Sequence, residues 1–166
     1  MKNSTAEFSI TTPFGKFIAI YSENGLAALN FPNGKAGSNR DAGDARISSK
    51  VRDWHRLTET TLKTMLSGEK PAKFPPLDLQ GTDFQKNVWR EMLKIPYGKT
   101  KSYGQIARAV GKPKAVRAVG GACGANSIPV LAPCHRVLAA NNKIGGFSSG
   151  LGWKSRLLEI EGVRLG

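Results

Sequence analysis

A proline-rich segment near the middle of the chain, Lys70–Gly81, constrains the fold more than any other feature. It holds Pro71, Pro75 and Pro76. Proline has no amide donor and a fixed φ, so neither a helix nor a central strand continues through such a segment. The chain of 166 residues is long enough for one large domain or two small ones with a real core. We therefore predict a linker here and two domains, residues 1–80 and 81–166.

The first half has strand character followed by helix character. Three short runs, Phe8–Pro13, Gly15–Tyr21 and Gly25–Phe31, are separated by turn residues and predict an antiparallel meander. The stretch Asn33–Asp44, rich in Gly, Asn and Asp, is typical of a loop. Apolar residues recur at helical spacing over Ser48–Ser67 and predict a long amphipathic helix. The first half is expected to be a small antiparallel sheet with one helix.

The second half opens with two capping boxes. In Thr82–Gln85 and in Ser102–Gln105 a hydroxyl residue is followed three positions later by glutamine, an arrangement that satisfies the free amides at a helix start. The first helix is expected to end before Pro96, and the second to run through about Val110. The second half is therefore mainly helical, and the whole chain is predicted to be α/β in the broad sense, an α+β fold.

A third helix is predicted to start at Pro113 and to run through Ala122, because proline suits a first-turn position. Together with the preceding helix and the tight Gly111–Lys112 turn it gives a helix-turn-helix pattern, although helical hairpins without DNA share that pattern. Major-groove readers need long side chains, in which this helix is poor. Its small residues indicate a close approach, either to the minor groove or to another helix: Ala115, Ala118, Gly120, Gly121, Ala122 and Gly124.

Positive charge is concentrated in the second half. The chain has a net charge of +13, of which residues 1–80 carry +3 (11 Lys/Arg, 8 Asp/Glu) and residues 81–166 carry +10 (14 Lys/Arg, 4 Asp/Glu). A one-sided field of this kind favours a polyanionic partner. A generic basic surface or an anionic membrane is the alternative, but no amphipathic helix with an aromatic edge supports the membrane. Nucleic acid is the predicted partner.

Compartment and metal content follow from residues that the chain lacks. Residues 1–12 have no apolar core of a secretory signal, and no apolar run approaches the ~20 residues that span a bilayer. Two cysteines in such a chain indicate free thiols in a reducing, cytoplasmic setting, so a Cys123–Cys134 disulfide is not expected. The two cysteines and two histidines fit no zinc-site spacing, and no metal is predicted.

The pentapeptide Pro133–Val137, Pro-Cys-His-Arg-Val, places Cys134 beside His135. Sulfur attacks as the thiolate, so a thiol next to a base suggests a nucleophile. Taken alone, the pair is more often a buried cysteine beside a surface histidine, because buried free cysteines are common. In an extended segment the two side chains point to opposite faces, so direct contact is not expected.

The ordered motifs between residues 82 and 163 resemble those of the O6-alkylguanine-DNA alkyltransferases. They are Ser102-Tyr103, Arg117–Gly121, Asn126, Pro133–Val137 and Leu157–Gly162. These proteins move an alkyl group from a damaged guanine in DNA to their own cysteine, once per molecule. The resemblance implies repair of double-stranded DNA by direct reversal, with irreversible transfer from O6-alkylguanine and O4-alkylthymine. It implies a monomer without a cofactor. The first half lacks the cysteines and histidines by which some members bind zinc.

The resemblance also assigns roles in catalysis. It makes Cys134 the nucleophile, His135 its base acting through a bridging water, and Glu161 the carboxylate that orients the histidine. Read alone, Glu161 is a solvated charge at a helix end, where the helix dipole disfavours it, which argues for a partner.

Further roles concern DNA and the damaged base. The resemblance assigns nucleotide flipping to Tyr103 and Arg117, the latter otherwise a solvated cation. Flipping is needed because the O6-alkyl carbon lies inside the stacked duplex. Asn126, otherwise a helix cap, would tie the recognition helix to the active-site segment. The remaining assignments are the minor-groove face of Ala115, Ala118 and Gly120, and the alkylguanine pocket of Asn126, Arg136, Phe147, Ser148 and Lys154.

One residue departs from the family pattern. Phe147 stands where most members have a tyrosine whose phenol donates a hydrogen bond to the leaving guanine. A phenylalanine keeps the apolar wall without the donor, so a slower transfer step is expected, with Ser148, Lys154 and backbone amides able to assist.

Two other function classes remain open. In one, the protein is a helix-turn-helix binder or regulator without catalysis, and Cys134 is structural. In the other it is a cysteine hydrolase that turns over many equivalents of an ester or amide. A hydrolase needs an oxyanion hole for its labile acyl-thioester, and none of the local hydrolase signatures surrounds Cys134.

Overall fold

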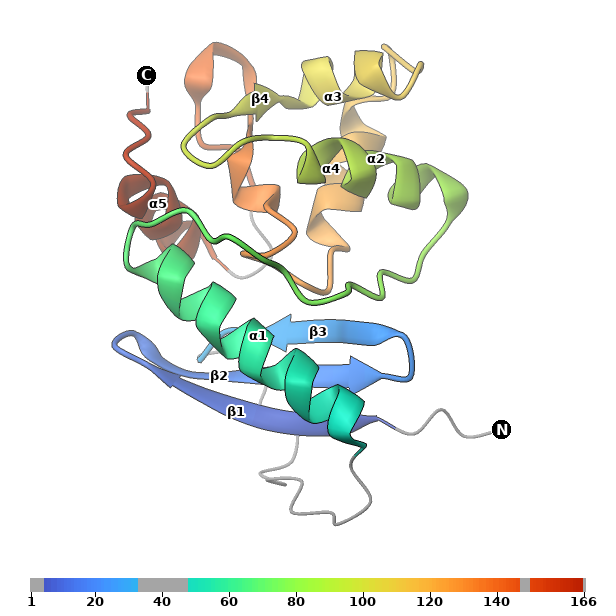
Figure 1. Cartoon of the computed structure of the whole chain (residues 1–166). Helices are drawn as coiled ribbons and strands as arrows, with labels where there is room; N and C mark the ends of the chain where they lie inside the picture. Colours follow the sequence, from blue (N-terminus) through green and yellow to red (C-terminus); the bar gives the residue numbers. More distant parts are fainter. Residues whose placement is uncertain (1–4, 33–47, 147–149, 166) are drawn as a thin grey trace.

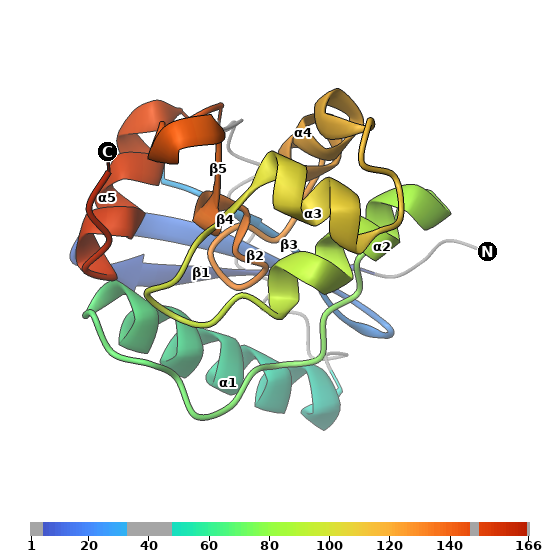
Figure 2. The ribbon, with the colours of Figure 1, turned by 90° about the horizontal axis from the view of Figure 1, so that it is seen from above.

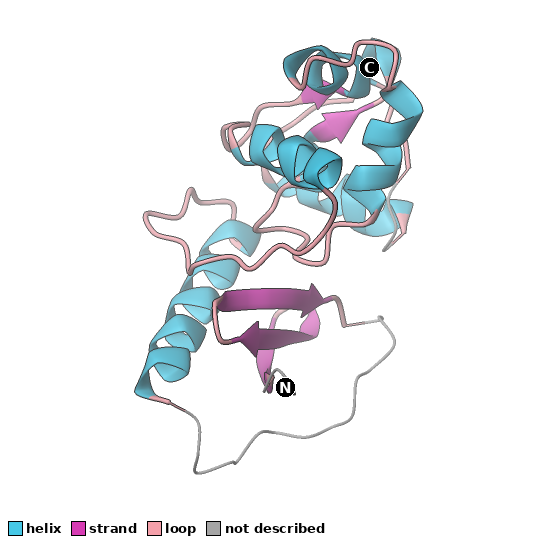
Figure 3. Cartoon of the chain, turned by 90° about the vertical axis from the view of Figure 1, so that its right-hand side faces the viewer, coloured by secondary structure: helices cyan, strands magenta, loops and turns pink. Residues whose placement is uncertain are grey.

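The computed structural model describes residues 5–32, 48–146 and 150–165. A three-stranded sheet and helix α1 form a lower layer, and the remaining helices lie above it (Figures 1 and 3). The predicted α+β arrangement is confirmed. The predicted loop Asn33–Asp44 and the pocket residues Phe147 and Ser148 lie outside the described residues.

The antiparallel meander predicted for the first half is confirmed. Strands β1 (Ala6–Thr12), β2 (Gly15–Ser22) and β3 (Gly25–Asn30) pair in that order. The β1–β2 turn is closed by the Thr12 hydroxyl, which donates to the Gly15 carbonyl at 2.7 Å and accepts from the Phe14 amide. Helix α1 (Ser49–Leu66), capped by the Ser48 side chain, crosses the sheet and buries its apolar stripe against it (Figure 1).

The predicted linker is packed along β3. The Leu26 amide donates to the Pro76 carbonyl at 2.8 Å, and the Asp78 amide donates to the Leu26 carbonyl at 2.7 Å. Thr61 of α1 donates to the Lys73 carbonyl. Gly25, with a φ of +146°, fits beneath this segment because an added Cβ would lie 2.4 Å from the Pro76 oxygen.

In its described residues, 81–146 and 150–165, the second half contains four α-helices: α2 (Asp83–Leu93), α3 (Tyr103–Ala109), α4 (Val116–Gly124) and α5 (Leu151–Ile160). Both predicted capping boxes, at Thr82 and Ser102, are present with reciprocal hydrogen bonds. None of the helices in the described ranges is long and apolar enough to cross a membrane.

The start of the third helix was predicted three residues too early. Pro113 lies in a turn closed by the Ala115 amide, which donates to the Lys112 carbonyl at 2.9 Å, and α4 begins only at Val116. Ala115 is therefore the N-cap residue. The later start does not change the predicted helix-turn-helix arrangement, because α2, α3 and α4 pack on one another.

The extended conformation predicted for the segment around Cys134 is wrong. The structure has a 3₁₀ turn over Cys134–Arg136. The Cys134 amide donates to Ala132, and the Arg136 amide donates to Pro133. The turn leads into β5 (Val137–Leu138), which pairs in parallel with β4 (Lys101–Ser102), and a second 3₁₀ turn follows over Ala140–Asn142. Seen from above, α5 lies on one side of this pair and the helix-turn-helix on the other (Figure 2).

The two halves share one buried core. Trp153 of α5 packs on Phe17 and Phe31 of the sheet region, with ring centroids 5.7 and 4.6 Å away. The Leu29 amide of β3 donates to the Ser127 carbonyl at 2.9 Å. Between the helices, the buried Trp89 indole donates to the Ala122 carbonyl at 2.8 Å and fixes α2 to α4. The sheet region and the helical half are thus packed together through one core.

Candidate active site

A cavity of about 580 Å³ brings the predicted nucleophile to the helix-turn-helix. Cys134 contributes to its wall and is 5% exposed. The cavity is also lined by Tyr103 of α3, by Arg117, Gly120 and Cys123 of α4, and by Gly146. Residues predicted separately for catalysis and for DNA contact therefore share one hollow.

Both cysteines are free thiols, and their surroundings keep them protonated at neutral pH. Burial raises the pKa of Cys134 to about 11, against the opposing effects of the Asn126 side chain and the Lys154 charge. Burial and the neighbouring Cys134 raise the pKa of Cys123 to about 12. Since attack requires the thiolate, Cys134 needs a base that removes its proton during the reaction.

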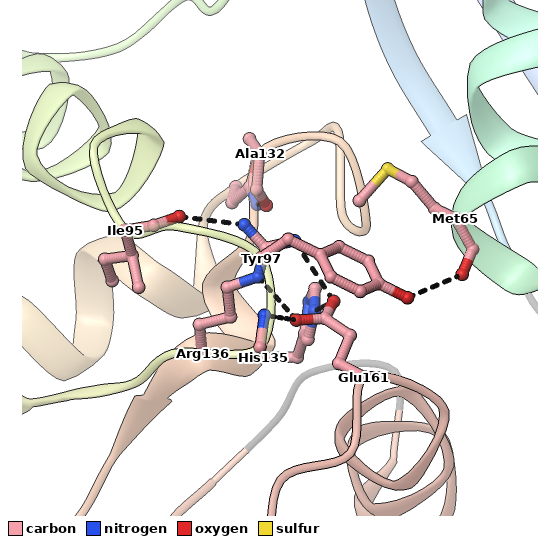
Figure 4. A network of polar contacts seen from close by, with 9 residues as sticks. Met65, Ile95, Tyr97, Ala132, His135, Arg136 and Glu161 are labelled. Atoms are coloured by element: carbon pink, nitrogen blue, oxygen red, sulfur yellow. Dashed lines mark hydrogen bonds and ion pairs between the residues drawn. The ribbon is translucent and has the colours of Figure 1, made fainter. Parts of the chain in front are cut away.

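His135 and Arg136 both meet Glu161 (Figure 4). His135 Nε2 lies 2.5 Å from Glu161 Oε2. The guanidinium of Arg136 donates from Nε to Oε1 at 2.8 Å and from Nη2 to Oε2 at 3.1 Å, and its Nη1 donates to the Ile95 carbonyl. The carboxylate is thus held by a two-pronged cation and by the imidazole, and all three side chains are almost completely buried.

This network fixes the tautomer of His135. Burial lowers the pKa of His135, and the charges of Arg136 and Lys154 lower it further, so that together they outweigh the raising effect of Glu161. A neutral imidazole that donates Nε2–H to Glu161 carries its lone pair on Nδ1. Nδ1 is buried and has no hydrogen-bond partner among the described residues. Nδ1 of His135 can therefore act as the proton acceptor, because its lone pair is not used by another hydrogen bond within the part of the chain that the structure describes.

Glu161 lies at the C-terminal cap of α5, where the helix dipole disfavours an anion. Burial alone would raise its pKa, but the hydrogen bonds from His135 and Arg136 outweigh burial and hold the pKa at about 2. The Gly98 amide donates to Oε1 at 3.1 Å. Glu161 is therefore a permanent anion with a fixed orientation, not a solvated charge.

Tyr97 and Gly98 also belong to the site, although the sequence Pro96-Tyr97-Gly98 by itself indicates only the end of the preceding helix. The Arg136 guanidinium lies 5.4 Å from the centroid of the Tyr97 ring, whose hydroxyl donates to the Met65 carbonyl of α1 (Figure 4). Gly98 adopts a φ of +79°, a conformation that favours glycine. That glycine signal was available in the sequence, but nothing in the sequence linked it to Glu161.

Asn126 connects α4 to the active-site turn. Its Nδ2 donates to the Ala132 carbonyl at 2.8 Å, and its Oδ1 accepts from the Ile128 amide at 2.9 Å. The C-cap of α4 is Ala125, so Asn126 is not the helix cap itself. Between these anchors, buried Val130 adopts a φ of +75°, which is strained for a β-branched residue. The segment before Cys134 is tightly held.

Two residues predicted for the alkylguanine pocket serve as supports in this structure. Arg136 points to Glu161 and Ile95, as described above. Lys154 is completely buried, and its Nζ donates to the Val137 carbonyl at 2.8 Å and to the Gly146 carbonyl at 3.1 Å. Burial lowers the pKa of Lys154, while the nearby thiols act in the opposite direction. Lys154 thereby ties the active-site strand to the loop that carries Gly146.

The predicted minor-groove residues lie on the outer side of α4. Arg117 and Ala118 are exposed, and Ala115 and Gly120 are half-buried. A Cβ added at Gly120, Gly121 or Gly124 would meet no atom within 4 Å. Close packing against another helix therefore does not explain these three glycines, and the space outside them is open to a partner.

A metal site is not evident in the part of the chain that the structure describes. No group of three or more His, Cys, Asp or Glu side chains in residues 5–32, 48–146 and 150–165 could hold an ion.

Comparison with known proteins identifies the family. The sequence model of the 6-O-methylguanine DNA methyltransferase DNA-binding domain matches residues 83–163. A methylated-DNA–protein-cysteine methyltransferase of Methanosarcina acetivorans is 39% identical over 151 residues, which cover 91% of this chain and 94% of that protein. The chain belongs to the methylated-DNA–protein-cysteine methyltransferase family.

Other members of the methyltransferase family agree over nearly the full length. The Methanosarcina mazei methyltransferase is 44% identical over 155 residues, covering 92% of this chain and 94% of that protein. The crystal structure of Mycobacterium tuberculosis OGT in complex with DNA matches with a TM-score of 0.76 at 36% identity, covering 94% of this chain and 92% of that one. The predicted family, fold and enzyme class are confirmed.

Proposed function

We propose that this methyltransferase repairs O6-alkylguanine in duplex DNA by one irreversible transfer of the alkyl group to Cys134. The observation that carries the proposal is the shared cavity, which is lined by Cys134 together with Tyr103 of α3 and Arg117 of α4. The same chemistry extends to O4-alkylthymine, whose alkyl group is also bonded to a base oxygen. The protein acts as a monomer in the cytoplasm.

Recognition begins with the basic surface and α4. The open space outside Gly120 and Gly121 suits the close approach of a minor groove. The target nucleotide rotates out of the stack because the alkyl carbon is otherwise unreachable. Tyr103 and Arg117 promote this rotation from the mouth of the cavity, and Arg117 occupies the gap left behind. Ala115 and Ala118 add further small contacts.

Proton transfer activates the thiol. A water molecule relays the proton of Cys134 to Nδ1 of His135, whose Nε2–H already donates to Glu161. The permanent negative charge of Glu161 stabilises the imidazolium that forms. Local deprotonation of this kind is required because burial raises the pKa of Cys134 to about 11.

The transfer itself is an in-line displacement at the alkyl carbon. An electron pair of Cys134 Sγ forms the new carbon–sulfur bond, and the bond between that carbon and the guanine oxygen breaks, leaving its electron pair on the base. The base then takes up a proton, so overall the thiol hydrogen and the alkyl group exchange places. The thioether product has no carbonyl for water to attack, so the reaction stops after one equivalent.

The deciding experiment mixes the protein with duplex DNA that carries one O6-methylguanine. Intact mass and a peptide map should report a gain of one methyl group, confined to Cys134 and ending at one equivalent. Cys134→Ala should gain nothing while still binding DNA, and Cys123→Ala, which removes the other thiol, should still gain its one methyl group at Cys134. An unchanged mass with tight binding to the lesion would leave a recognition protein without catalysis. Repeated turnover of an ester would instead indicate a hydrolase.

A further inference from the structure

One face of α4 forms part of the cavity rim, and Val116 is the aliphatic side chain that this face contributes to the cavity. Val116, Gly120 and Gly124 are spaced four residues apart, so they lie on one face of the helix, and all three line the cavity that contains Cys134. The glycines leave open space. Arg117 and Cys123 also line the cavity from α4, but Cys123 is only 7% exposed, so the isopropyl group of Val116, 41% exposed, is the accessible apolar surface of this rim.

Val116 is an unexpected residue at this place. It is 41% exposed and apolar, while its neighbours in the same turn region include the exposed cations Lys114 and Arg117. Valine is also a poorer helix former than the alanines nearby. The cations suit phosphate oxygens, but an isopropyl group gains nothing from phosphate. It gains from contact with the apolar parts of a nucleotide, the sugar carbons and the base face.

The rigidity of valine adds to its suitability. In a helix the β-branched side chain keeps one preferred χ1 rotamer, so the methyl groups present a fixed surface. A fixed apolar surface at the mouth of a cavity favours a nucleotide that lies inside over one that is stacked in the duplex.

We propose that Val116 is a substrate-contacting residue that packs against the deoxyribose of the lesion nucleotide and holds that nucleotide in the cavity. The inference rests on the proposed function. It assigns Val116 a task separate from that of Arg117: Arg117 fills the space in the duplex, and Val116 retains the nucleotide that has left it.

The test compares two substrates in single-turnover reactions. One is duplex DNA with O6-methylguanine, and the other is the free base O6-methylguanine, which has no sugar. Val116→Ala removes two methyl-sized groups. Their loss corresponds to a transfer rate about fifteenfold lower for a fully buried contact and about fivefold lower for a contact at the rim. The rate with duplex DNA should fall by about that factor, while the rate with the free base and the affinity for undamaged duplex stay within about twofold.

Two further variants sharpen the comparison. Val116→Thr keeps the shape but replaces a methyl group with a hydroxyl, and its rate with duplex DNA should lie between those of valine and alanine. Leu93→Ala changes an apolar residue that is 43% exposed on α2, outside the cavity, and should leave both rates unchanged.

Two outcomes overturn the inference alone: an unchanged rate of Val116→Ala with duplex DNA, or an equal loss with both substrates, which would mean that Val116 only shapes the pocket. If the unsubstituted protein transfers nothing from duplex DNA, the proposed function fails and this inference falls with it.

Discussion

His135 donates through Nε2 to Glu161 at 2.5 Å, and its buried Nδ1 has no hydrogen-bond partner among the described residues. The carboxylate therefore decides which nitrogen of the imidazole is free. Burial, helped by the charge of Arg136 beside Glu161, lowers the pKa of His135, so the histidine stays neutral and its free nitrogen stays unprotonated. This relationship makes the pH behaviour of the protein predictable.

The transfer rate should be flat around neutral pH. The pKa of His135 lies below its ordinary value of 6.5, so the imidazole is still neutral when the pH falls through 6.5. The transfer rate should therefore drop only at a pH below 6.5. The pKa of Cys134 is about 11, so no inflection from a freely titrating thiol is expected between about pH 7 and 9. Single-turnover rates measured by mass spectrometry across this range check both limbs. A step near pH 8.5 would contradict the buried thiol.

Removing Arg136 should move the acid limb to higher pH. Arg136→Met leaves the Glu161 charge unbalanced, which favours imidazolium and raises the pKa of His135. Breaking a buried ion pair also costs about 3–5 kcal/mol of stability. The pH–rate profile of the variant is the measurement, and Arg156→Met, an exposed arginine on α5, is the matched control. An unmoved limb would mean that Arg136 does not govern the histidine.

Stability should fall in acid as Glu161 takes up a proton. Its pKa drops from an ordinary 4.5 to about 2 on folding, so its contribution is fully present above pH 4.5 and is lost as the pH falls from there towards 2. The contribution is about 3 kcal/mol at most. Urea unfolding at several pH values measures it, and Glu161→Gln should show a shallower acid decline. Equal declines in both proteins would place the acid-sensitive group elsewhere.

Asn126 should matter for stability as well as for reaction. Asn126→Ala leaves the Ile128 amide and the Ala132 carbonyl without this partner, at a cost of about 2–4 kcal/mol. In Asn126→Asp the side chain still accepts from the Ile128 amide, but it turns a carboxylate towards the Ala132 carbonyl and the Cys134 thiol. Transfer by this variant should therefore be slower than transfer by Asn126→Ala. Thermal unfolding and single-turnover rates separate the two effects. If Asn126→Ala were as stable as the parent protein, Asn126 would not anchor the active-site turn to α4.

The glycines of α4 should separate folding from binding. Gly121→Ala and Gly124→Ala meet no atom and should raise the free energy of unfolding by about 0.5–1 kcal/mol each. Gly121→Leu should fold as well but bind duplex DNA more weakly, because the side chain occupies the space needed for the groove. Fluorescence anisotropy with duplex DNA is the measurement. Undiminished binding by Gly121→Leu would exclude a close approach at this face.

Local signals predicted most of the fold, and contacts across the chain explain what they missed. The capping boxes at Thr82 and Ser102 gave helix starts to the residue, because a cap is a contact within four residues. Pro113 misled because proline suits a turn as well as a first helical position, and the Ala115–Lys112 hydrogen bond selects the turn. The support of Glu161 by Gly98 joins residues 63 positions apart, which no local pattern encodes.

The covered edge of β3 bears on how the protein can be handled. Leu26 exchanges two backbone hydrogen bonds with Pro76 and Asp78, and Leu29 bonds to Ser127. Unpaired strand edges recruit strands from other chains, and prolines stop a covering segment from extending the ladder. If the chain were cut after residue 80, the first piece would lose the Leu29–Ser127 hydrogen bond. The second piece would expose Trp153. Either piece alone should be prone to aggregation, so tags and fusions belong at the termini.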